Sequence, residues 1–287
     1  MQPIIIGTDE AGYGPNLGPL VASITAWEAD MQNLECLYEP LKHAGIPIDD
    51  SKKLYHSGSL ATLEASLLAS LRASSQESPL ERHTSITPIA NDEEKIIRLS
   101  EKFESILQQH HVRLLDMQYR CVEPKEFNQL LDRFDSKGTL LSNVTLCLIA
   151  EQLERLPQGK DIFILCDKHG GRNHYLDILS EFFPDEFIQV VQQSRQSSVY
   201  RLALANRKLE FRFVAKGETH LPIALASMLS KYHRELAMIR FNAFWQSHLP
   251  DLRPTAGYPE DAKRFKQQIA EVQKRLGIAD DALWRRR

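Results

Sequence analysis

The chain has 287 residues, of which 43% are hydrophobic and 25% charged, as in an ordinary globular protein. Its 35 basic and 38 acidic side chains give a net charge of −3, which excludes a protein that coats nucleic acid through a generally basic surface. A nucleic-acid-binding protein of this composition needs a local basic patch or a bound cation. The four cysteines form no CxxC pair, so we expect reduced thiols and no zinc site (Cys36, Cys121, Cys147 and Cys166). No signal peptide and no membrane-spanning run is evident, and we expect a cytoplasmic protein without a membrane partner.

The first third of the chain begins with a pair of predicted strands. Residues 3–8 and 20–27 are β-rich and are separated by a stretch punctuated with glycine and proline, a pattern typical of a hairpin with an elaborate connection. Short helical patterns follow within residues 31–72. Residues 73–88 are rich in Ser and Thr without any period and predict a loop or a flexible insertion. Apolar residues at helical spacing predict an amphipathic helix over residues 92–109.

The second half predicts further strands between two helices. A helical pattern spans residues 140–156, and the continuously apolar run 162–166 predicts a strand covered on both faces. Residues 198–203 and 209–215 are expected strands, and residues 222–245 a long helix with a proline in its first turn. Because strands and helices mix without strict βαβ alternation or repeats, we expect an α/β fold with a mixed central sheet flanked by helices.

Two carboxylates, Asp9 and Glu10, end the first predicted strand and precede a glycine-rich loop. Adjacent carboxylates repel each other, and burial makes both costly unless a cation is present. Glycines also allow backbone N–H groups to approach a ligand closely. The pair therefore indicates a place where a metal and a phosphate or sugar meet, and a solvated acidic turn is the alternative.

Two further carboxylates are candidates for the same site. Asp167 ends the apolar run at 162–166, although it is also well placed to cap the Gly170-Gly171 turn. Glu235 lies on the 222–245 helix at the border of the buried face, where an ion pair with Lys231 is the alternative. Together the four carboxylates suit hydrolysis of a phosphodiester by two divalent cations about 3.5–4 Å apart. Oxygen ligands without His or Cys favour Mg²⁺ or Mn²⁺.

Five short blocks, in order along the chain, resemble those of the type 2 ribonucleases H. Residues 7–15 (GTDEAGYGP) and 17–21 (LGPLV) resemble the opening strand and loop, where the family reads Asp-Glu-Ala-Gly-Arg-Gly-Pro. The other blocks are DSKKL at 50–54, ILCD at 164–167, KGE at 216–218 followed by ASMLSKYHRE at 226–235, and GYP at 257–259. The resemblance spans most of the chain, and its first block is the most specific.

This resemblance implies a ribonuclease H fold and a metal-dependent endonuclease. The expected substrates are the RNA strand of RNA/DNA hybrids and ribonucleotides embedded in duplex DNA. Asp9 is expected to bridge two Mg²⁺ or Mn²⁺ ions, and the carboxylates of Glu10, Asp167 and Glu235 to complete the metal shell. Glu235 stands where the family usually has Asp.

The resemblance also implies which residues contact the substrate. Gly12, Tyr13 and Gly14 are expected to face the ribose 2′-OH mainly through backbone groups, which distinguishes RNA from DNA. Lys53 is expected to contact a phosphate, and Tyr258 to stack on the sugar beside the cleaved bond. Tyr13 replaces an arginine of the family, so a two-point guanidinium–phosphate contact is lost. We therefore expect weaker substrate binding with the ribose preference largely kept.

The domain organisation expected from the blocks is a single ribonuclease H-like domain over residues 1–287. Residues 57–111 are longer than the family pattern needs and predict a helical insertion, and residues from about 246 predict a helical C-terminal part. Two alternatives stay open for the function. One is a nuclease of the same fold that cuts structured DNA or RNA, and the other is a nucleic-acid-binding module without catalysis. The intact carboxylates argue against the second, because buried charges without a role are costly.

Overall fold

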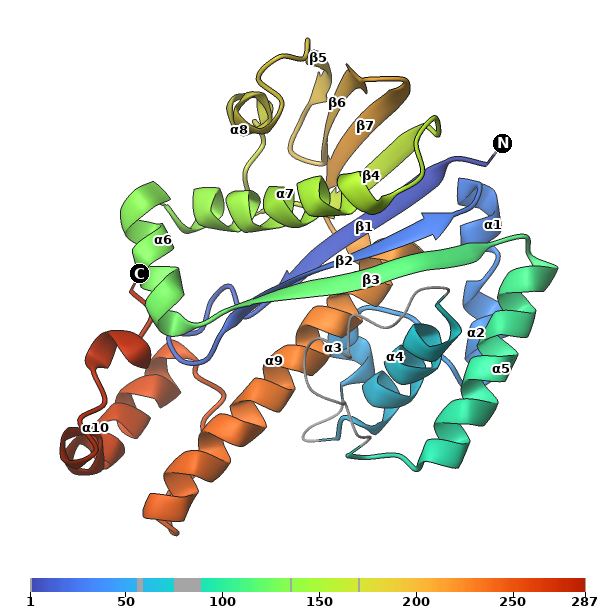
Figure 1. The fold of residues 1–287 in the computed structure, drawn as a ribbon. Coiled ribbons are helices and arrows are strands. Elements are labelled where there is room, and N and C mark those ends of the chain that lie inside the picture. The colour runs from blue at the N-terminus through green and yellow to red at the C-terminus, as the bar shows by residue number, and fades with distance from the viewer. Residues whose placement is uncertain (1, 56–58, 75–88, 135, 170, 287) are drawn as a thin grey trace.

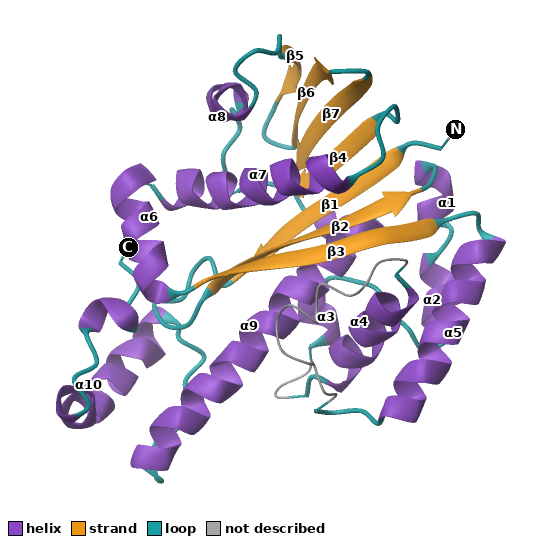
Figure 2. Cartoon of the chain, viewed as in Figure 1, coloured by secondary structure: helices purple, strands orange, loops and turns teal. Residues whose placement is uncertain are grey.

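A computed structural model of the protein describes residues 2–55, 59–74, 89–134, 136–169 and 171–286. Within these residues a seven-stranded sheet has the order β3-β2-β1-β4-β7-β6-β5 (Figures 1 and 2). β4 runs parallel to β1 and to β7, whereas the other neighbouring pairs are antiparallel, so the expected mixed sheet is confirmed. The strands are β1 (Ile4–Ala11), β2 (Leu20–Glu28), β3 (Arg113–Val122), β4 (Ile162–Asp167), β5 (Gln189–Gln193), β6 (Ser197–Leu204) and β7 (Arg207–Val214).

Helices cover both faces of the sheet, as expected for this fold class, with α7 and α9 on opposite sides (Figure 1). The predicted hairpin, the three later strands and the helices near residues 92–109, 140–156 and 222–245 are all present. β3, β5, α6 and α8 are not among the elements predicted from the sequence. The helices are α1 (Met31–Glu35), α2 (Tyr38–His43), α3 (Ser51–Leu54), α4 (Ala61–Ala73), α5 (Glu93–Gln109), α6 (Pro124–Phe134), α7 (Lys137–Arg155), α8 (Leu176–Phe182), α9 (Leu221–His248) and α10 (Pro259–Arg275), with short 3₁₀ turns η2 (Gly217–Thr219) and η3 (Asp280–Ala282).

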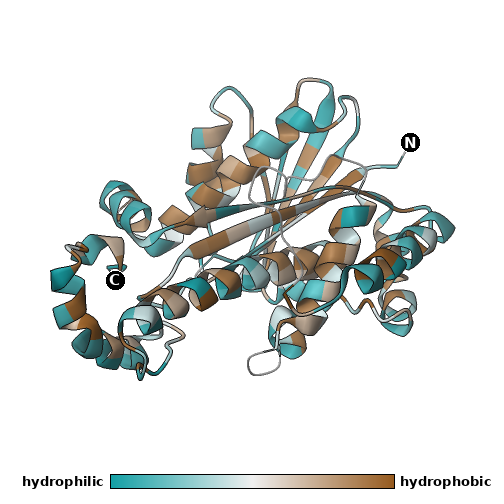
Figure 3. Ribbon diagram, turned by 60° about the horizontal axis from the view of Figure 1, so that its bottom comes forward, coloured by the Kyte–Doolittle hydropathy of each residue, from teal (hydrophilic) through white to brown (hydrophobic). Residues whose placement is uncertain are grey.

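The start of α9 packs directly on β1, and Gly7 makes this contact possible. A side chain at Gly7 would collide with the carbonyl group of Pro222, so only glycine allows the helix so close to the strand. Thr25 Oγ1 on β2 donates to the Pro222 carbonyl at 2.8 Å and holds the same junction. Hydrophobic residues, brown in Figure 3, run along the strands of the sheet, and those facing α9 form a buried core with it. Consequently the middle of α9 passes over the carboxyl end of β1, where Ser230 Oγ donates to the Asp9 carbonyl at 3.1 Å.

The predicted insertion at 57–111 contributes α4 and α5, which pack on the α9 side of the sheet. Glu64 of α4 is fully buried and joins the two parts, because it accepts a hydrogen bond from Tyr232 Oη of α9 at 2.8 Å. Most of the loop expected at 73–88 lies outside the described residues. No helix in the described ranges is long and apolar enough to cross a membrane.

The C-terminal region is helical, as expected, and forms a small core of its own with the end of α9. This core contains Trp245, Phe265 and Ile269, and it also takes in Leu17 from the connection between β1 and β2. Leu17 forms an isolated antiparallel bridge with Trp284 near the C-terminus. The connection at 12–19, called the glycine loop below, is therefore held between the sheet and the C-terminal helical region.

Candidate active site

Three of the predicted carboxylates lie together at one end of the sheet. Asp9 and Glu10 occupy the last part of β1, and Asp167 is the last residue of β4. Because β1 and β4 are parallel, with Thr8 paired to Cys166, the residues that follow this pair lie side by side. The strands thus bring together carboxylates that are far apart in the sequence.

A fourth carboxylate, Glu218, joins them from the turn after β7. β7 is the parallel neighbour of β4, and Lys216 then adopts a left-handed conformation with φ of 59°, which turns the chain into η2. The Gly217 N–H donates to Asp167 Oδ1 at 2.8 Å and fixes this turn against β4. Glu218 was quoted within the KGE block but was not assigned a role from the sequence.

Burial and mutual repulsion make these charges costly. Burial, with smaller contributions from the charges of Asp167 and Glu218, raises the pKa of Asp9 to about 8 against the hydrogen bonds from Ser227 and the Glu10 N–H. The pKa of Glu10 is raised by burial and then by Asp9, Asp167 and Glu218. Burial also raises the pKa of Asp167, again with a contribution from Glu218. We call Asp9, Glu10, Asp167 and Glu218 the strand-end carboxylates.

Glu235 has a different environment. Its carboxylate accepts hydrogen bonds from Lys231 Nζ at 2.6 Å and Tyr55 Oη at 3.1 Å, and it lies 3.4 Å from Arg234 Nη1. The ion pair with Lys231, the alternative interpretation of the sequence, is therefore present. Glu235 has its charge neutralised by neighbouring cations, whereas the strand-end carboxylates repel one another.

The strand-end carboxylates fit a hard divalent cation by their chemistry. All their ligand atoms are oxygens, and Lys52 is the cation that lowers the pKa of both Glu10 and Asp167. Within the described residues, no group of three or more His, Cys, Asp or Glu side chains has the geometry to hold a metal ion. The side chains would have to move closer together to share one. A bound cation would offset the cost of burying these charges and reduce the repulsion between them.

The glycine loop leaves the sheet directly after Glu10. Gly12 has φ of 87°, and a Cβ there would lie 2.7 Å from Arg234 Nε, so a larger residue is not accommodated. A Cβ at Gly14 would meet nothing within 4 Å, so this side of the loop is open to a ligand. The loop is therefore held in place at Gly12 and accessible to a ligand at Gly14.

Tyr13 lies between the glycine loop and α7. Its hydroxyl is 3.9 Å from the position of a Cβ at Gly138. Burial and the charge of Glu10 raise the pKa of Tyr13, while the charge of Arg172 opposes this. Arg172 follows β4 and donates to Thr139 Oγ1 at 2.6 Å. A guanidinium is thus present near position 13, although it comes from a different segment.

Tyr258 lies at the other side of the glycine loop, before α10. It is 55% exposed and close enough to Arg234 to influence the pKa of that side chain. Arg234 is buried beneath Gly12 and donates to the Ala256 carbonyl at 2.9 Å. The predicted sugar-contacting tyrosine is therefore exposed beside the loop that carries Gly12 and Gly14.

The two lysines of α3 differ in their surroundings. Lys53 is ion-paired with Asp49 at 2.8 Å, and its side chain is 65% exposed. Lys52 influences Glu10 and Asp167, as described above. A cavity of about 690 Å³ connects this region with Glu218, and its lining includes Lys42, Lys52, Lys53 and Lys216. The positive charge that acts on both Glu10 and Asp167 is thus that of Lys52, for which the sequence predicts no role of its own.

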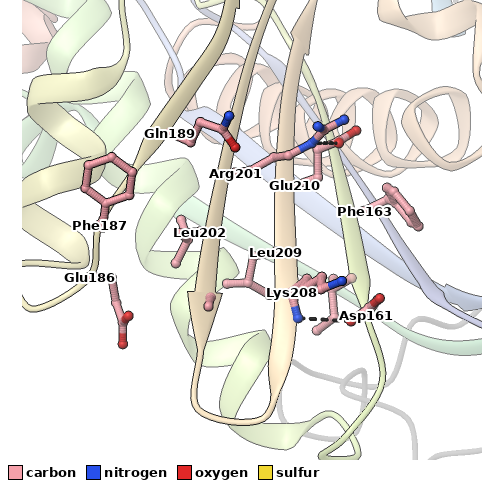
Figure 4. Close-up of a pocket in the computed structure, with 12 residues that line it drawn as sticks. Asp161, Phe163, Glu186, Phe187, Gln189, Arg201, Leu202, Lys208, Leu209 and Glu210 are labelled. Carbon is pink, nitrogen blue, oxygen red and sulfur yellow. Dashed lines mark hydrogen bonds and ion pairs between the residues drawn. The ribbon is translucent and has the colours of Figure 1, made fainter.

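Another cavity of about 620 Å³ lies at the opposite end of β4 (Figure 4). Several of its polar side chains are already paired, since Arg201 Nε donates to Glu210 Oε2 at 2.5 Å and Asp161 Oδ1 accepts from the Lys208 N–H at 3.0 Å. Because this cavity borders the start of β4 rather than its end, it contains none of the strand-end carboxylates. It is not part of the candidate site.

Comparison with known proteins gave structural likenesses only. No family model and no curated protein matches the chain. The structure is similar to RNase HII from Archaeoglobus fulgidus, solved in complex with PCNA, at 17% identity and a TM-score of 0.49, covering 99% of this chain and 94% of that one. It is also similar to ribonuclease H2 from Pyrococcus horikoshii, at 19% identity and a TM-score of 0.47, covering 98% and 92%. Bst-RNase HIII in complex with Mn²⁺ is similar at 15% identity and a TM-score of 0.43, covering 99% and 66%.

Proposed function

We propose that the protein is a metal-dependent endonuclease of the ribonuclease H type. Its proposed substrates are the RNA strand of RNA/DNA hybrids and ribonucleotides embedded in duplex DNA. The observation that carries this proposal is the group of strand-end carboxylates, whose charges repel one another and whose removal from water raises the pKa of Asp9, Glu10 and Asp167. Such an arrangement is costly for a folded protein unless a cation binds there. The five sequence blocks connect this site to phosphodiester hydrolysis.

The residues proposed to hold two Mg²⁺ or Mn²⁺ ions are Asp9, Glu10, Asp167 and Glu218. Glu218 takes the position first given to Glu235, because Glu218 affects the pKa of the other three carboxylates and Glu235 is held by Lys231 and Tyr55. When bound, such ions activate a water molecule and stabilise the leaving oxygen. Asp9 has both Asp167 and Glu218 among the charges that act on it, which suits a shared ligand.

The substrate is proposed to approach along the glycine loop. Backbone groups at Gly12 and Gly14 face the ribose, where a 2′-OH both donates and accepts hydrogen bonds and so marks RNA. Tyr258 is exposed beside the loop and offers its ring to the neighbouring sugar. Lys52 is placed to hold a phosphate near the carboxylates, and Lys53 to hold one further along the cavity described above. These contacts would position the cleaved bond without the family's arginine.

Glu235 is proposed to be a positioning residue instead of a metal ligand. It holds Lys231 and Tyr55, and Arg234 beside it lies directly beneath Gly12. Loss of Glu235 would therefore disturb the support of the glycine loop and leave the strand-end carboxylates in place. This separates its effect on activity from that of Glu218.

The proposal is tested with duplexes that differ only in sugar. All-DNA, single-ribonucleotide and RNA/DNA hybrid duplexes of one sequence are incubated with the protein and Mg²⁺ or Mn²⁺, and with EDTA as control. We expect cleavage at ribonucleotides, none in EDTA, and none by Asp9→Asn. Equal cleavage of all-DNA duplexes would favour a nuclease with a changed substrate. Binding without any cleavage would favour the non-catalytic module.

A further inference from the structure

A small cavity on the far side of the glycine loop has the character of an anion site. It measures about 260 Å³ and lies between the loop, the first turns of α10 and the C-terminal segment. Lys263 and Lys266 of α10 form one wall, and Asn16, Trp284 and Arg285 form the other. None of these residues belongs to the site proposed above.

Arg285 is the deepest charge in this cavity. It is 2% exposed, its Nη2 donates to the Pro15 carbonyl, and its Nε and Nη1 have no hydrogen-bond partner. The guanidinium carbon lies 4.8 Å from the centre of the Phe127 ring. Burial, with a smaller contribution from the positive charge of Arg234, lowers the pKa of Arg285 to about 9. A buried cation with two unpaired nitrogens is under-compensated, and an anion in the cavity would supply the missing charge.

The lysines on the rim of the cavity have only weak partners. Lys263 pairs with Glu260 at 2.9 Å, and Lys266 pairs with Asp280 at 3.2 Å. All four side chains are about half exposed or more, and exposed ion pairs of this kind contribute little. Lys266 also lies 4.9 Å from the centre of the Trp284 ring, which directs it over the cavity wall. Both lysines can therefore exchange a carboxylate for a phosphate without a large cost.

Hydrogen bonds connect the cavity to the glycine loop. The Arg285 N–H donates to the Asn16 carbonyl at 2.9 Å, and Asn16 Nδ2 donates back to the Arg285 carbonyl at 3.1 Å. On the other side, the Asn16 N–H donates to the Gly257 carbonyl at 2.8 Å. An anion bound here would stabilise the segment that holds the loop beside Gly12 and Gly14.

We propose that this cavity binds a backbone phosphate of the nucleic acid whose ribose lies at the glycine loop. The inference rests on the proposed function. Pro259 lines the cavity and directly follows Tyr258, so a strand that contacts Tyr258 passes its entrance. Lys263 and Lys266 hold the phosphate, and Arg285 adds an unscreened positive charge from below.

The test measures duplex binding as a function of salt. The Asp9→Asn protein, which binds without cutting, is compared with the same protein carrying Lys263→Gln and Lys266→Gln. Each phosphate contact adds about 0.9 to the slope of log affinity against log salt. We expect the double lysine variant to lose about 1 in this slope and about tenfold in affinity at low salt. Lys274→Gln, at the other end of α10, is the matched control and should change neither.

The outcomes separate the cavity from the proposed function and from a free-anion site. An unchanged slope, with duplex binding intact, overturns the cavity proposal alone. Failure of the Asp9→Asn protein to bind any duplex overturns the proposed function. In a second arm, inorganic phosphate is titrated into the metal-free protein while its melting temperature is followed. A phosphate-dependent rise that needs the two lysines, together with an unchanged duplex slope, would identify a site for free phosphate and overturn the strand contact.

Discussion

Carboxylates lie in two buried regions of the protein, and their hydrogen-bonding environments differ. Glu64, on the α9 side of the sheet, is fully buried but accepts hydrogen bonds from the Ile89 and Ala90 N–H groups and Tyr232 Oη at 2.8 Å each. Asn91 Nδ2 donates to it at 3.0 Å. The charge of Glu64 is thus satisfied by donors from two segments, residues 89–91 and α9.

The strand-end carboxylates have the opposite environment. Asp9 is also buried and Glu10 is half-buried, but their strongest electrostatic neighbours are other carboxylates. Burial alone therefore does not distinguish the two regions, whereas the supply of donors does. The hydrogen-bonded carboxylate of Glu64 joins two parts of the fold, whereas the mutually repelling strand-end carboxylates favour the binding of a cation. Single substitutions can compare Glu64 with the strand-end carboxylates, and Glu218 with Glu235.

The largest effect is expected for Glu218→Gln. If Glu218 completes the metal site, the isosteric amide removes one charged ligand, and kcat should fall by about 10²–10³-fold, equivalent to about 3–4 kcal/mol. Glu235→Gln is the matched comparison and should lose less than about tenfold, because its partners are Lys231 and Tyr55. Steady-state cleavage of a single-ribonucleotide duplex measures both. The reverse ranking would return Glu235 to the metal site.

A loss of stability, not of chemistry, is expected at Glu64. Glu64→Ala leaves the buried Tyr232 hydroxyl without its acceptor, and a buried donor without a partner costs about 1–3 kcal/mol. We therefore expect the free energy of unfolding to fall by about 1–3 kcal/mol in urea titrations. The folded fraction should keep its kcat. A variant as stable as the wild type would show that Glu64 does not hold the insertion to α9.

The neighbouring lysines of α3 provide a smaller test. Lys52 acts on Glu10 and Asp167, whereas Lys53 is paired with Asp49. A charge-assisted contact to a phosphate contributes about 1.5–3 kcal/mol, so Lys52→Gln should lower kcat/KM by about tenfold or more. Lys53→Gln should lower it by less than about threefold. Equal losses would mean that the ion pair with Asp49 does not weaken the proposed phosphate contact of Lys53.

Tyr13→Arg is expected to have the smallest effect, which is an increase in kcat/KM. The substitution restores a guanidinium that can contact a phosphate, but Arg172 already places one near Tyr13. We expect kcat/KM to rise by about threefold, with the cleavage position unchanged. Sequencing-gel mapping of the products measures both quantities. A shifted cleavage position would assign Tyr13 a direct role in substrate selection.

Much of this architecture could be predicted from the sequence, because apolar periodicity marks the hairpin and α9, and because strand ends mark Asp9, Glu10 and Asp167. β3 was missed since Asp116 and Gln118 are buried within it and interrupt its apolar pattern. They are hydrogen-bonded to each other at 2.5 Å, a pairing that only the folded chain provides. Polar residues satisfied inside a strand carry no sequence signal.

The roles proposed for Glu218 and Lys52 lack a clear sequence signal for a related reason. Glu218 reaches the site through a short turn after a left-handed residue, and periodicity says nothing about where such a turn places a side chain. Glu235 lay on a recognisable helix and was therefore easier to select. Similarly, Lys52 and Lys53 are adjacent in sequence, and only the ion pair with Asp49 separates their roles.

The most direct measurement compares the thermal stability of wild type and Asp9→Asn, without and with Mn²⁺. Removing one of several repelling charges should leave the metal-free Asp9→Asn protein at least as stable as wild type, although Asp9 is buried. Mn²⁺ should raise the melting temperature of wild type by mass action and have little effect on Asp9→Asn. A metal-free Asp9→Asn protein that is clearly destabilised, or an equal rise with Mn²⁺ in both proteins, would contradict a cation site at the strand ends.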